Sequence, residues 1–336
     1  MTTCMNIKAR FFLSAIAALL LTACTQDNAP EKTLEVAVKG LYAAAFSDDG
    51  KLAVVGSIYH GGSLWRLADG EKLYSWNHRQ GEQSMLMAAD FSPDGNWAMT
   101  ASINSLVLWN TREGEAVRYW TAPGEVLSIA LSSNGDFALL GLSDHSAVLF
   151  DVKRGGIKRT FVHGNRVRSV DLSSDGRLAI TGSEDYTATL WDLASGKQLQ
   201  QIKHDDDVQM VAISPDGRIA MSAAKYDKAV LWDTRTGDLL GEIPLGTEKL
   251  RRGLRFTTAR FNSDGSQLLT GRPDEIVQLW DTASVQLVDS WKIPKRDKWQ
   301  PTGAAVIAVA FDPNDNRYYA AGSNGMLHTL ARQVVQ

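Results

Sequence analysis

A unit of about forty residues repeats along the chain from Leu34 onward, and this repetition restricts the fold more than any other feature. Each unit has an apolar residue four positions before a turn residue, and a second, mostly aromatic residue about nineteen positions later. These pairs are Phe46/Trp65, Phe91/Trp109, Leu131/Phe150, Leu172/Trp191, Ile213/Trp232, Phe261/Trp280 and, more weakly, Phe311/Leu330. Because one such unit cannot bury its own apolar face, the copies are expected to pack against one another.

Inside each unit, short runs of alternating apolar residues are separated by tight turns. The turn residues are Gly50, Gly95, Gly135, Gly176, Gly217, Gly265 and, in the degraded seventh copy, Asp315. Only glycine easily takes the positive φ that such turns require, so each unit is predicted to form four short antiparallel strands. Radial packing of the sheets covers their faces and shortens their edges. The sequence therefore predicts an all-β fold, a single seven-bladed β-propeller.

The two ends of the repeat region complement each other. The seventh unit stops at Gln336, just after its third strand, whereas Thr33–Lys39 forms an additional strand before the first unit. The N-terminal strand is thus expected to be the outer strand of the last blade and to close the ring. The predicted domain covers 33–336, without an internal linker.

The clearest unit carries His163-Gly164, Asp175-Gly176 and Trp191-Asp192, and it resembles the WD-repeat family. The resemblance implies a hydrogen-bonded network within the blade, made here by His163, Ser183, Asp185 and Trp191. A His-Ser-Asp set also invites a catalytic interpretation, but its repeat spacing favours a structural one.

Other units match this network less well. The position of Asp185 is taken by Asp144, Asp274 and Asn324 in blades three, six and seven, but by Tyr59, Ile103 and Tyr226 in blades one, two and five. Blades one and two are therefore expected to lack the network.

The first residues carry an export signal rather than part of the fold. Lys8 and Arg10 precede the apolar run Phe11–Leu21, which is too short to span a membrane. The run ends in Leu21-Thr22-Ala23-Cys24, which resembles the lipobox of bacterial lipoproteins. The resemblance implies a signal peptide over 1–23, a lipid on Cys24 and a polar tether over 24–32. Because Thr25 rather than Asp follows Cys24, an outer membrane anchor facing the periplasm is expected ahead of the inner membrane.

Composition argues against several classes of chemistry. Both cysteines, Cys4 and Cys24, precede the predicted propeller, and the six histidines show no metal-ligand spacing. No nucleophile elbow or phosphate loop is present, so we predict no catalytic residue, metal or cofactor. Loss of the two positive charges of the signal peptide takes the formal net charge from −3 to −5, which disfavours nucleic acid as a partner.

Function is expected where the units differ. The two longest connections lead into blades six and seven, and both are basic; the residues predicted to bind a partner are Arg251, Arg252, Arg255, Lys295, Arg296, Lys298 and Trp299. They belong to the face that carries the connections between blades, which we call the top. The N-terminal strand begins at the opposite, bottom face, so the top is expected to look away from the membrane toward an acidic partner.

Three functions fit these features. The first is a membrane-anchored, monomeric platform that binds another protein or an envelope assembly. The second is an enzyme, such as a propeller hydrolase or lactonase, or a small-ligand receptor, using the central channel or a top-face pocket. The third is binding of an anionic polymer through the basic loops. The sequence favours the first and leaves the partner, the pathway, the membrane face and the content of the channel open.

Overall fold

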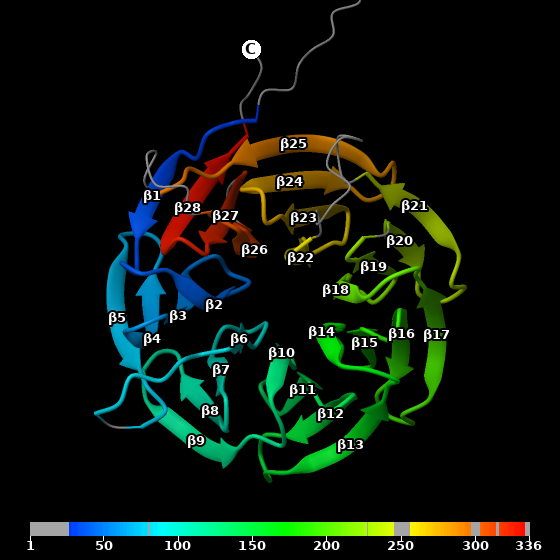
Figure 1. Cartoon of the computed structure of the whole chain (residues 1–336), viewed down its shortest axis with the longest axis horizontal. Helices are drawn as coiled ribbons and strands as arrows, with labels where there is room; N and C mark the ends of the chain where they lie inside the picture. The colour runs from blue at the N-terminus through cyan, green and yellow to red at the C-terminus, as the bar shows by residue number, and fades with distance from the viewer. Residues whose placement is uncertain are drawn as a thin grey trace, which may run out of the picture.

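The computed structural model describes residues 27–79, 81–226, 228–244, 256–296, 303–313 and 316–332. Over these ranges the chain forms seven four-stranded antiparallel sheets arranged around a central axis (Figure 1). The predicted all-β, seven-bladed propeller is confirmed. Within the same ranges, no helix has the length and apolar character needed to cross a bilayer.

Each blade contributes one strand to each of four concentric positions (Figure 1). The innermost strands are β2 (Leu41–Phe46), β6 (Ala88–Phe91), β10 (Val126–Leu131), β14 (Val167–Leu172), β18 (Val208–Ile213), β22 (Thr258–Phe261) and β26 (Val306–Phe311). The second strands are β3 (Leu52–Ser57), β7 (Trp97–Ser102), β11 (Phe137–Leu142), β15 (Leu178–Ser183), β19 (Ile219–Ala224), β23 (Gln267–Gly271) and β27 (Arg317–Gly322). The third strands are β4 (Gly61–Arg66), β8 (Ser105–Asn110), β12 (Ser146–Asp151), β16 (Thr187–Asp192), β20 (Ala229–Asp233), β24 (Ile276–Asp281) and β28 (Met326–Ala331). The outermost strands are β5 (Glu71–Trp76), β9 (Ala116–Thr121), β13 (Ile157–Val162), β17 (Gln198–Lys203), β21 (Leu239–Ile243), β25 (Gln286–Lys292) and, for blade seven, β1 (Lys32–Glu35).

The turn between the first and second strands explains the repeated glycine. In blade one, the Ser47 hydroxyl donates to Asp49 Oδ1 at 2.6 Å and accepts the Leu52 N–H at 2.9 Å. This arrangement leaves Gly50 at φ 66°, a conformation that a side chain disfavours. The same serine–aspartate bond recurs in blades two, four and five, so the repeat in the sequence is a repeat of turn chemistry.

Neighbouring blades share their hydrophobic cores. Met99 and Leu108 of blade two pack with Ile129 and Leu140 of blade three in one buried cluster. Burying one such side chain contributes about 1.5–3 kcal/mol, and each blade makes these contacts on both faces. A blade is therefore stable only between two others.

The N-terminal strand closes the ring as predicted. In Figure 1, β1 (blue) lies against β28 (red), with Lys32 opposite Thr329 and Glu35 opposite Met326. The strand is shorter than the predicted Thr33–Lys39. It ends at Glu35 because the N–H groups of Val36 and Ala37 both turn to the carbonyl of Gly325, at 2.9 and 3.1 Å.

The residues just before β1 depart from the prediction of a tether over 24–32. Asn28 forms a parallel bridge with Trp291 on β25 of blade six, and its side chain donates to Asp289 at 2.7 Å. The Glu31 N–H then donates to Thr329 on β28 at 2.8 Å. We call 27–31 the strap, because it crosses from the outer strand of blade six to blade seven. The tether interpretation thus fails for Asp27 to Lys32; Cys24 itself lies outside the described residues.

Candidate functional site

Blade four contains the hydrogen-bonded network that the sequence suggested, with one residue exchanged. His163 Nδ1 lies 3.1 Å from Asp185 Oδ2, and its Nε2 lies 2.9 Å from Thr181 Oγ1. Trp191 Nε1 donates to the same Thr181 hydroxyl at 2.8 Å. The predicted member Ser183 instead accepts the Asp185 N–H at 3.1 Å.

Register explains why Thr181 replaces Ser183. Trp191 lies opposite Ala179 on β15, so Thr181 is its diagonal neighbour on the same face of the sheet. Ser183 lies two residues further along, at the end of the strand and opposite Val167. The sequence offered two hydroxyls on one face, and only the pairing of the strands selects between them.

The environment of this set favours structure over catalysis. Burial raises the pKa of Asp185, but hydrogen bonds from His163, Thr187 and the Gly164 N–H outweigh it and hold the pKa well below its ordinary range. A carboxylate can only accept, so His163 Nδ1 carries the proton and Nε2 accepts the Thr181 O–H. Each polar group of the set is thus satisfied within the blade.

Blade two contains a related network, although the sequence predicted that it lacks one. His78 Nε2 lies 2.8 Å from Thr100 Oγ1, which also accepts Trp109 Nε1–H at 2.8 Å. Ser105, 2.6 Å from His78 Nδ1, stands where the carboxylate acts in blade four. Burial lowers the pKa of His78 to about 4, so the ring is neutral at neutral pH. The prediction was wrong because it required an acid where Ser105 provides the partner.

The top face carries exposed apolar residues at one repeated position. Tyr59, Ile103 and Tyr226 replace the network aspartate in the loops between the second and third strands of blades one, two and five. Their exposed fractions are 61%, 56% and 56%. Tyr186, in the corresponding loop of blade four, is also exposed. In three blades, therefore, the position that elsewhere stabilises the loop presents a large apolar side chain to the outside.

Two members of the predicted basic surface are described, and both form contacts within the propeller. Arg296 donates to the carbonyls of Ala37 and Val38, at 2.8 and 2.6 Å, and pairs with Glu35. Lys295 Nζ lies 3.5 Å from Glu275. Arg296 thus helps hold the closing strand, a structural role that the sequence did not predict. The remaining predicted members, Arg251, Arg252, Arg255, Lys298 and Trp299, lie outside the described residues.

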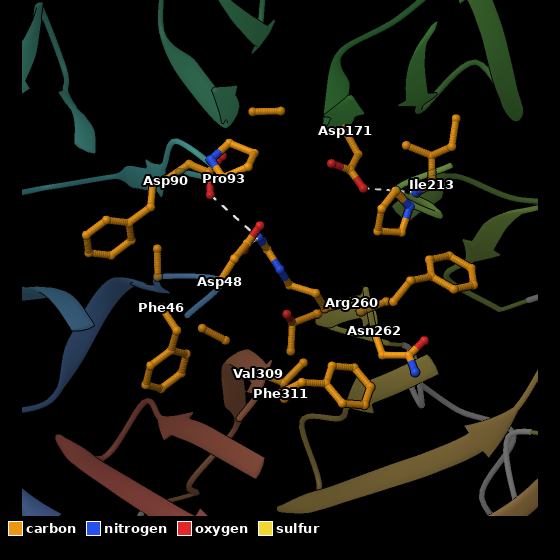
Figure 2. A pocket seen from close by; sticks show the side chains of 18 of the residues that line it. Phe46, Asp48, Asp90, Pro93, Asp171, Ile213, Arg260, Asn262, Val309 and Phe311 are labelled. Atoms are coloured by element: carbon orange, nitrogen blue, oxygen red, sulfur yellow. Dashed lines mark hydrogen bonds and ion pairs between the residues drawn. The ribbon is translucent and has the colours of Figure 1, made fainter. Parts of the chain in front are cut away.

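A cavity of about 670 Å³ lies on the axis and is lined by the inner strands of all seven blades. Five charged residues line it: Asp48 after β2, Asp90 on β6, Asp171 on β14, Arg260 on β22 and Asp312 after β26. Figure 2 shows Arg260 reaching across the opening toward Asp48 and Asp90. Arg260 is ion-paired with Asp48, and its second terminal nitrogen lies 3.9 Å from Asp90.

Both inner-strand aspartates also connect neighbouring blades. Asp90 Oδ2 accepts the Leu131 N–H of blade three at 2.9 Å. Asp171 Oδ2 accepts the Ile213 N–H of blade five, also at 2.9 Å (Figure 2). Burial raises the pKa of Asp90 to about 7 and that of Asp171 to about 6, although Arg260 and these N–H groups oppose the shift. The two carboxyl groups can therefore take up protons near neutral pH.

The chemistry available in this cavity is narrow. Its charged groups already have bonding partners within the propeller. Across the described parts of the chain, no three histidine, cysteine or carboxylate side chains are grouped so that they could hold a metal ion. We interpret the cluster first as a set of bonds that links neighbouring blades. Its second property is that Asp90 and Asp171 can take up protons.

Comparison with known proteins places the repeat in a family. Residues 155–192, from the turn before β13 to the end of β16, match the family described as WD domain, G-beta repeat. The chain is a seven-bladed β-propeller in which one unit, in blades three and four, is similar to the WD40 repeat. WD40 propellers commonly act as protein-interaction scaffolds and are typically not enzymes. No curated protein matches the chain.

The charged cluster in the axial cavity of this propeller was not predicted from the sequence, although the sequence contains a signal for it. The residue just before the apolar landmark is alanine in blades one, three, five and seven: Ala45, Ala130, Ala212 and Ala310. In the other three blades it is Asp90, Asp171 and Arg260. Three charges at one register of inner strands converge on the axis only once the ring is closed, and aligning the units at this position reveals them.

Proposed function

We propose that this WD40 propeller is a protein-binding platform of the bacterial cell envelope, held by lipid on Cys24 and binding another protein through its top face. The outer membrane, facing the periplasm, is the proposed location, on the basis of Thr25 after the cleavage site. The proposal treats the protein as a non-enzymatic monomer without a cofactor.

The observation that carries the proposal is the set Tyr59, Ile103 and Tyr226. These side chains occupy one loop position and lie exposed, whereas the equivalent Asp185 bonds inside its blade. Tyrosine is enriched in binding hot spots because it combines a large apolar area with a hydroxyl. Three such residues on one face of a rigid ring supply the anchors that a protein interface needs.

Charge supports an acidic partner less directly. Arg251, Arg252 and Arg255 precede the inner strand of blade six, and Lys298 with Trp299 precede that of blade seven. We propose these residues as a second contact region on the same face. Arg296 is not part of it, because its guanidinium bonds to backbone carbonyls beside β1.

The test is capture of a partner by tagged, full-length protein, extracted in mild detergent after crosslinking in cells. The variant carries Tyr59→Ala, Ile103→Ala and Tyr226→Ala. If each side chain is an anchor, each truncation costs about 1–2 kcal/mol of binding, so the triple variant loses the stoichiometric partner. The measurement is the ratio of partner to tagged protein by quantitative mass spectrometry.

A matched control shortens three exposed apolar residues on the outer wall: Val117→Ala on β9, Leu199→Ala on β17 and Leu240→Ala on β21. The control is expected to retain the partner, and both variants are expected to keep the wild-type melting temperature. Equal partner capture by the two triple variants contradicts the assignment to the top face.

A second candidate, a small-ligand receptor, is favoured by the charged cavity on the axis. Native mass spectrometry of the same preparation tests it. A bound small molecule, together with no protein partner for any variant, supports this function instead of the platform.

A further inference from the structure

The strap attaches the chain to the outer strand of blade six from Asp27, the first described residue. The Asn28 N–H donates to the Ser290 carbonyl at 2.8 Å, and the Lys292 N–H donates to the Asn28 carbonyl at 2.9 Å. The Ser290 hydroxyl also donates to Asp27 at 2.6 Å. On the blade-seven side, Arg317 pairs with Glu31 at 3.1 Å. Both backbone and side chains therefore hold 27–31 in place.

The strap lies where blade six meets blade seven. In Figure 1, the chain enters at the outer edge between the end of β25 (orange) and β28 (red), before continuing into β1 (blue). We call this place the seam. The seam is on the outer circumference of the ring, not on its bottom face, where the sequence placed the start of the closing strand.

Chain length then limits how far the seam can be from a lipid on Cys24. Only Thr25 and Gln26 separate Cys24 from Asp27. Three extended residues reach about 11 Å, against roughly 30 Å for the nine-residue tether that the sequence suggested. The headgroup layer of one leaflet is itself about 5–8 Å thick. A lipidated chain thus has only a few ångströms of slack beyond the headgroups.

We propose that the seam rests against the lipid headgroups, so that the propeller stands edge-on and its top face looks along the membrane rather than away from it. The inference rests on the lipid anchor of the proposed function. The acidic residues at the seam each have a partner within the propeller: Ser290 for Asp27, Arg317 for Glu31, Arg296 for Glu35 and Asn28 for Asp289. The basic side chains of Lys32, Lys292 and Arg332 are exposed there, and they match the negative charge of anionic headgroups. The top face is then presented sideways to a partner anchored in the same membrane.

Fluorescence quenching in vesicles tests this orientation. The sequence has two cysteines, Cys4 and Cys24. In the lipoprotein Cys4 is removed with the signal peptide and Cys24 is blocked by lipid, so one introduced cysteine takes up the label. Lys292→Cys places it on the last residue of β25 at the seam. Val162→Cys places it at the same position of β13, in blade three on the far side of the ring (Figure 1). The full-length lipoprotein is reconstituted into phosphatidylethanolamine–phosphatidylglycerol vesicles that contain headgroup spin-labelled lipid.

The label on Lys292→Cys is expected to be quenched several-fold more than the label on Val162→Cys. A further variant, Asp27→Gly with Asn28→Gly, removes the side-chain bonds of the strap and lengthens the free chain; it is expected to reduce this difference. Equal quenching at both sites in lipidated, vesicle-bound protein overturns the edge-on orientation and leaves the anchor intact. Absence of lipid on Cys24, seen as an unchanged mass and no vesicle binding, overturns both the anchor and the orientation.

Discussion

At the scale of single residues, one hydroxyl decides whether a blade keeps its network. Thr181 donates to His163 and accepts from Trp191, whereas Thr270 in blade six accepts from Trp280 at 3.0 Å, and blade six has no histidine at the position of His163. Removing the Thr270 hydroxyl leaves the indole N–H of Trp280 without this partner. Removing the Thr181 hydroxyl leaves two groups without it, His163 Nε2 and the indole N–H of Trp191, so the cost is larger.

We therefore expect Thr181→Val to lower the free energy of unfolding by about 3 kcal/mol, and the matched Thr270→Val by about 1–2 kcal/mol. Urea unfolding followed by tryptophan fluorescence measures both. An equal cost for the two variants means that the bond between His163 and Thr181 contributes nothing.

A second residue-scale property is the response of Asp90 to pH. Because burial raises its pKa to about 7 in the folded protein, against about 4 in the unfolded chain, the folded state holds a proton that the unfolded state has released. The contribution of Asp90 to stability therefore falls as the pH rises from about 4 to about 7.

Asp90→Asn places no charge in the buried site, and its Oδ1 can still accept the Leu131 N–H. The variant is expected to have a higher melting temperature than wild type at pH 8 and a similar one at pH 5. Asp94→Asn is the control: hydrogen bonds from Ser92 and Asn96 outweigh burial and lower the pKa of Asp94, so this variant loses stability at pH 8. If Asp90→Asn is less stable than wild type at pH 8, attraction to Arg260 exceeds the cost of burial.

The residues that the sequence did not identify share a physical cause. Asp90, Asp171 and Arg260 come from units some forty or more residues apart, and they meet only because inner strands converge on an axis. Thr181 and Ser183 are chemically equivalent on paper, and strand register separates them. Local composition carries neither piece of information.

At the scale of elements, the strands and turns were the most predictable part, because each is coded by alternation and by a turn glycine. The strap was the least predictable. Its polar residues look like a tether, and their partners on β25 lie more than two hundred residues away. A segment that is held mainly by backbone hydrogen bonds to a distant strand has no characteristic sequence pattern from which it could be predicted.

Arg296 links two elements, and its removal tests their contact. Three carbonyls, those of Ala37, Val38 and Asn324, accept from its guanidinium, and 26% of its side chain is exposed. Arg296→Met is expected to cost about 2 kcal/mol of unfolding free energy, reduced from the buried value by solvent screening. Partner capture by the folded variant is expected to stay at the wild-type level.

The matched change is Arg66→Met, where an exposed arginine pairs only with the exposed Asp69 and Glu71. Its cost is expected to stay below about 1 kcal/mol. Thermal unfolding of both variants decides the point: equal losses mean that the carbonyl bonds of Arg296 add nothing to an ordinary surface ion pair.

At the scale of the whole molecule, the number of blades followed from counting units, and closure followed from an unfinished last unit. The orientation of the propeller relative to the membrane did not follow from the sequence. The position of the first strand in the blade suggested a tether at the bottom, whereas the strap carries the chain onto the outer circumference at β25. Orientation depends on where the chain leaves the domain, which is a property of the folded ring.

Closure by β1 also sets an order of events for the growing polypeptide. The ribosome makes Lys32–Glu35 long before their partners Met326–Thr329. At about 5–20 residues per second, roughly 15 to 60 seconds separate them. For that interval the earliest strand has no ladder to join, and it must be kept from pairing with other nascent chains. Blade seven is therefore completed only after Met326–Thr329 have been made, and the strap can dock across blades six and seven only then.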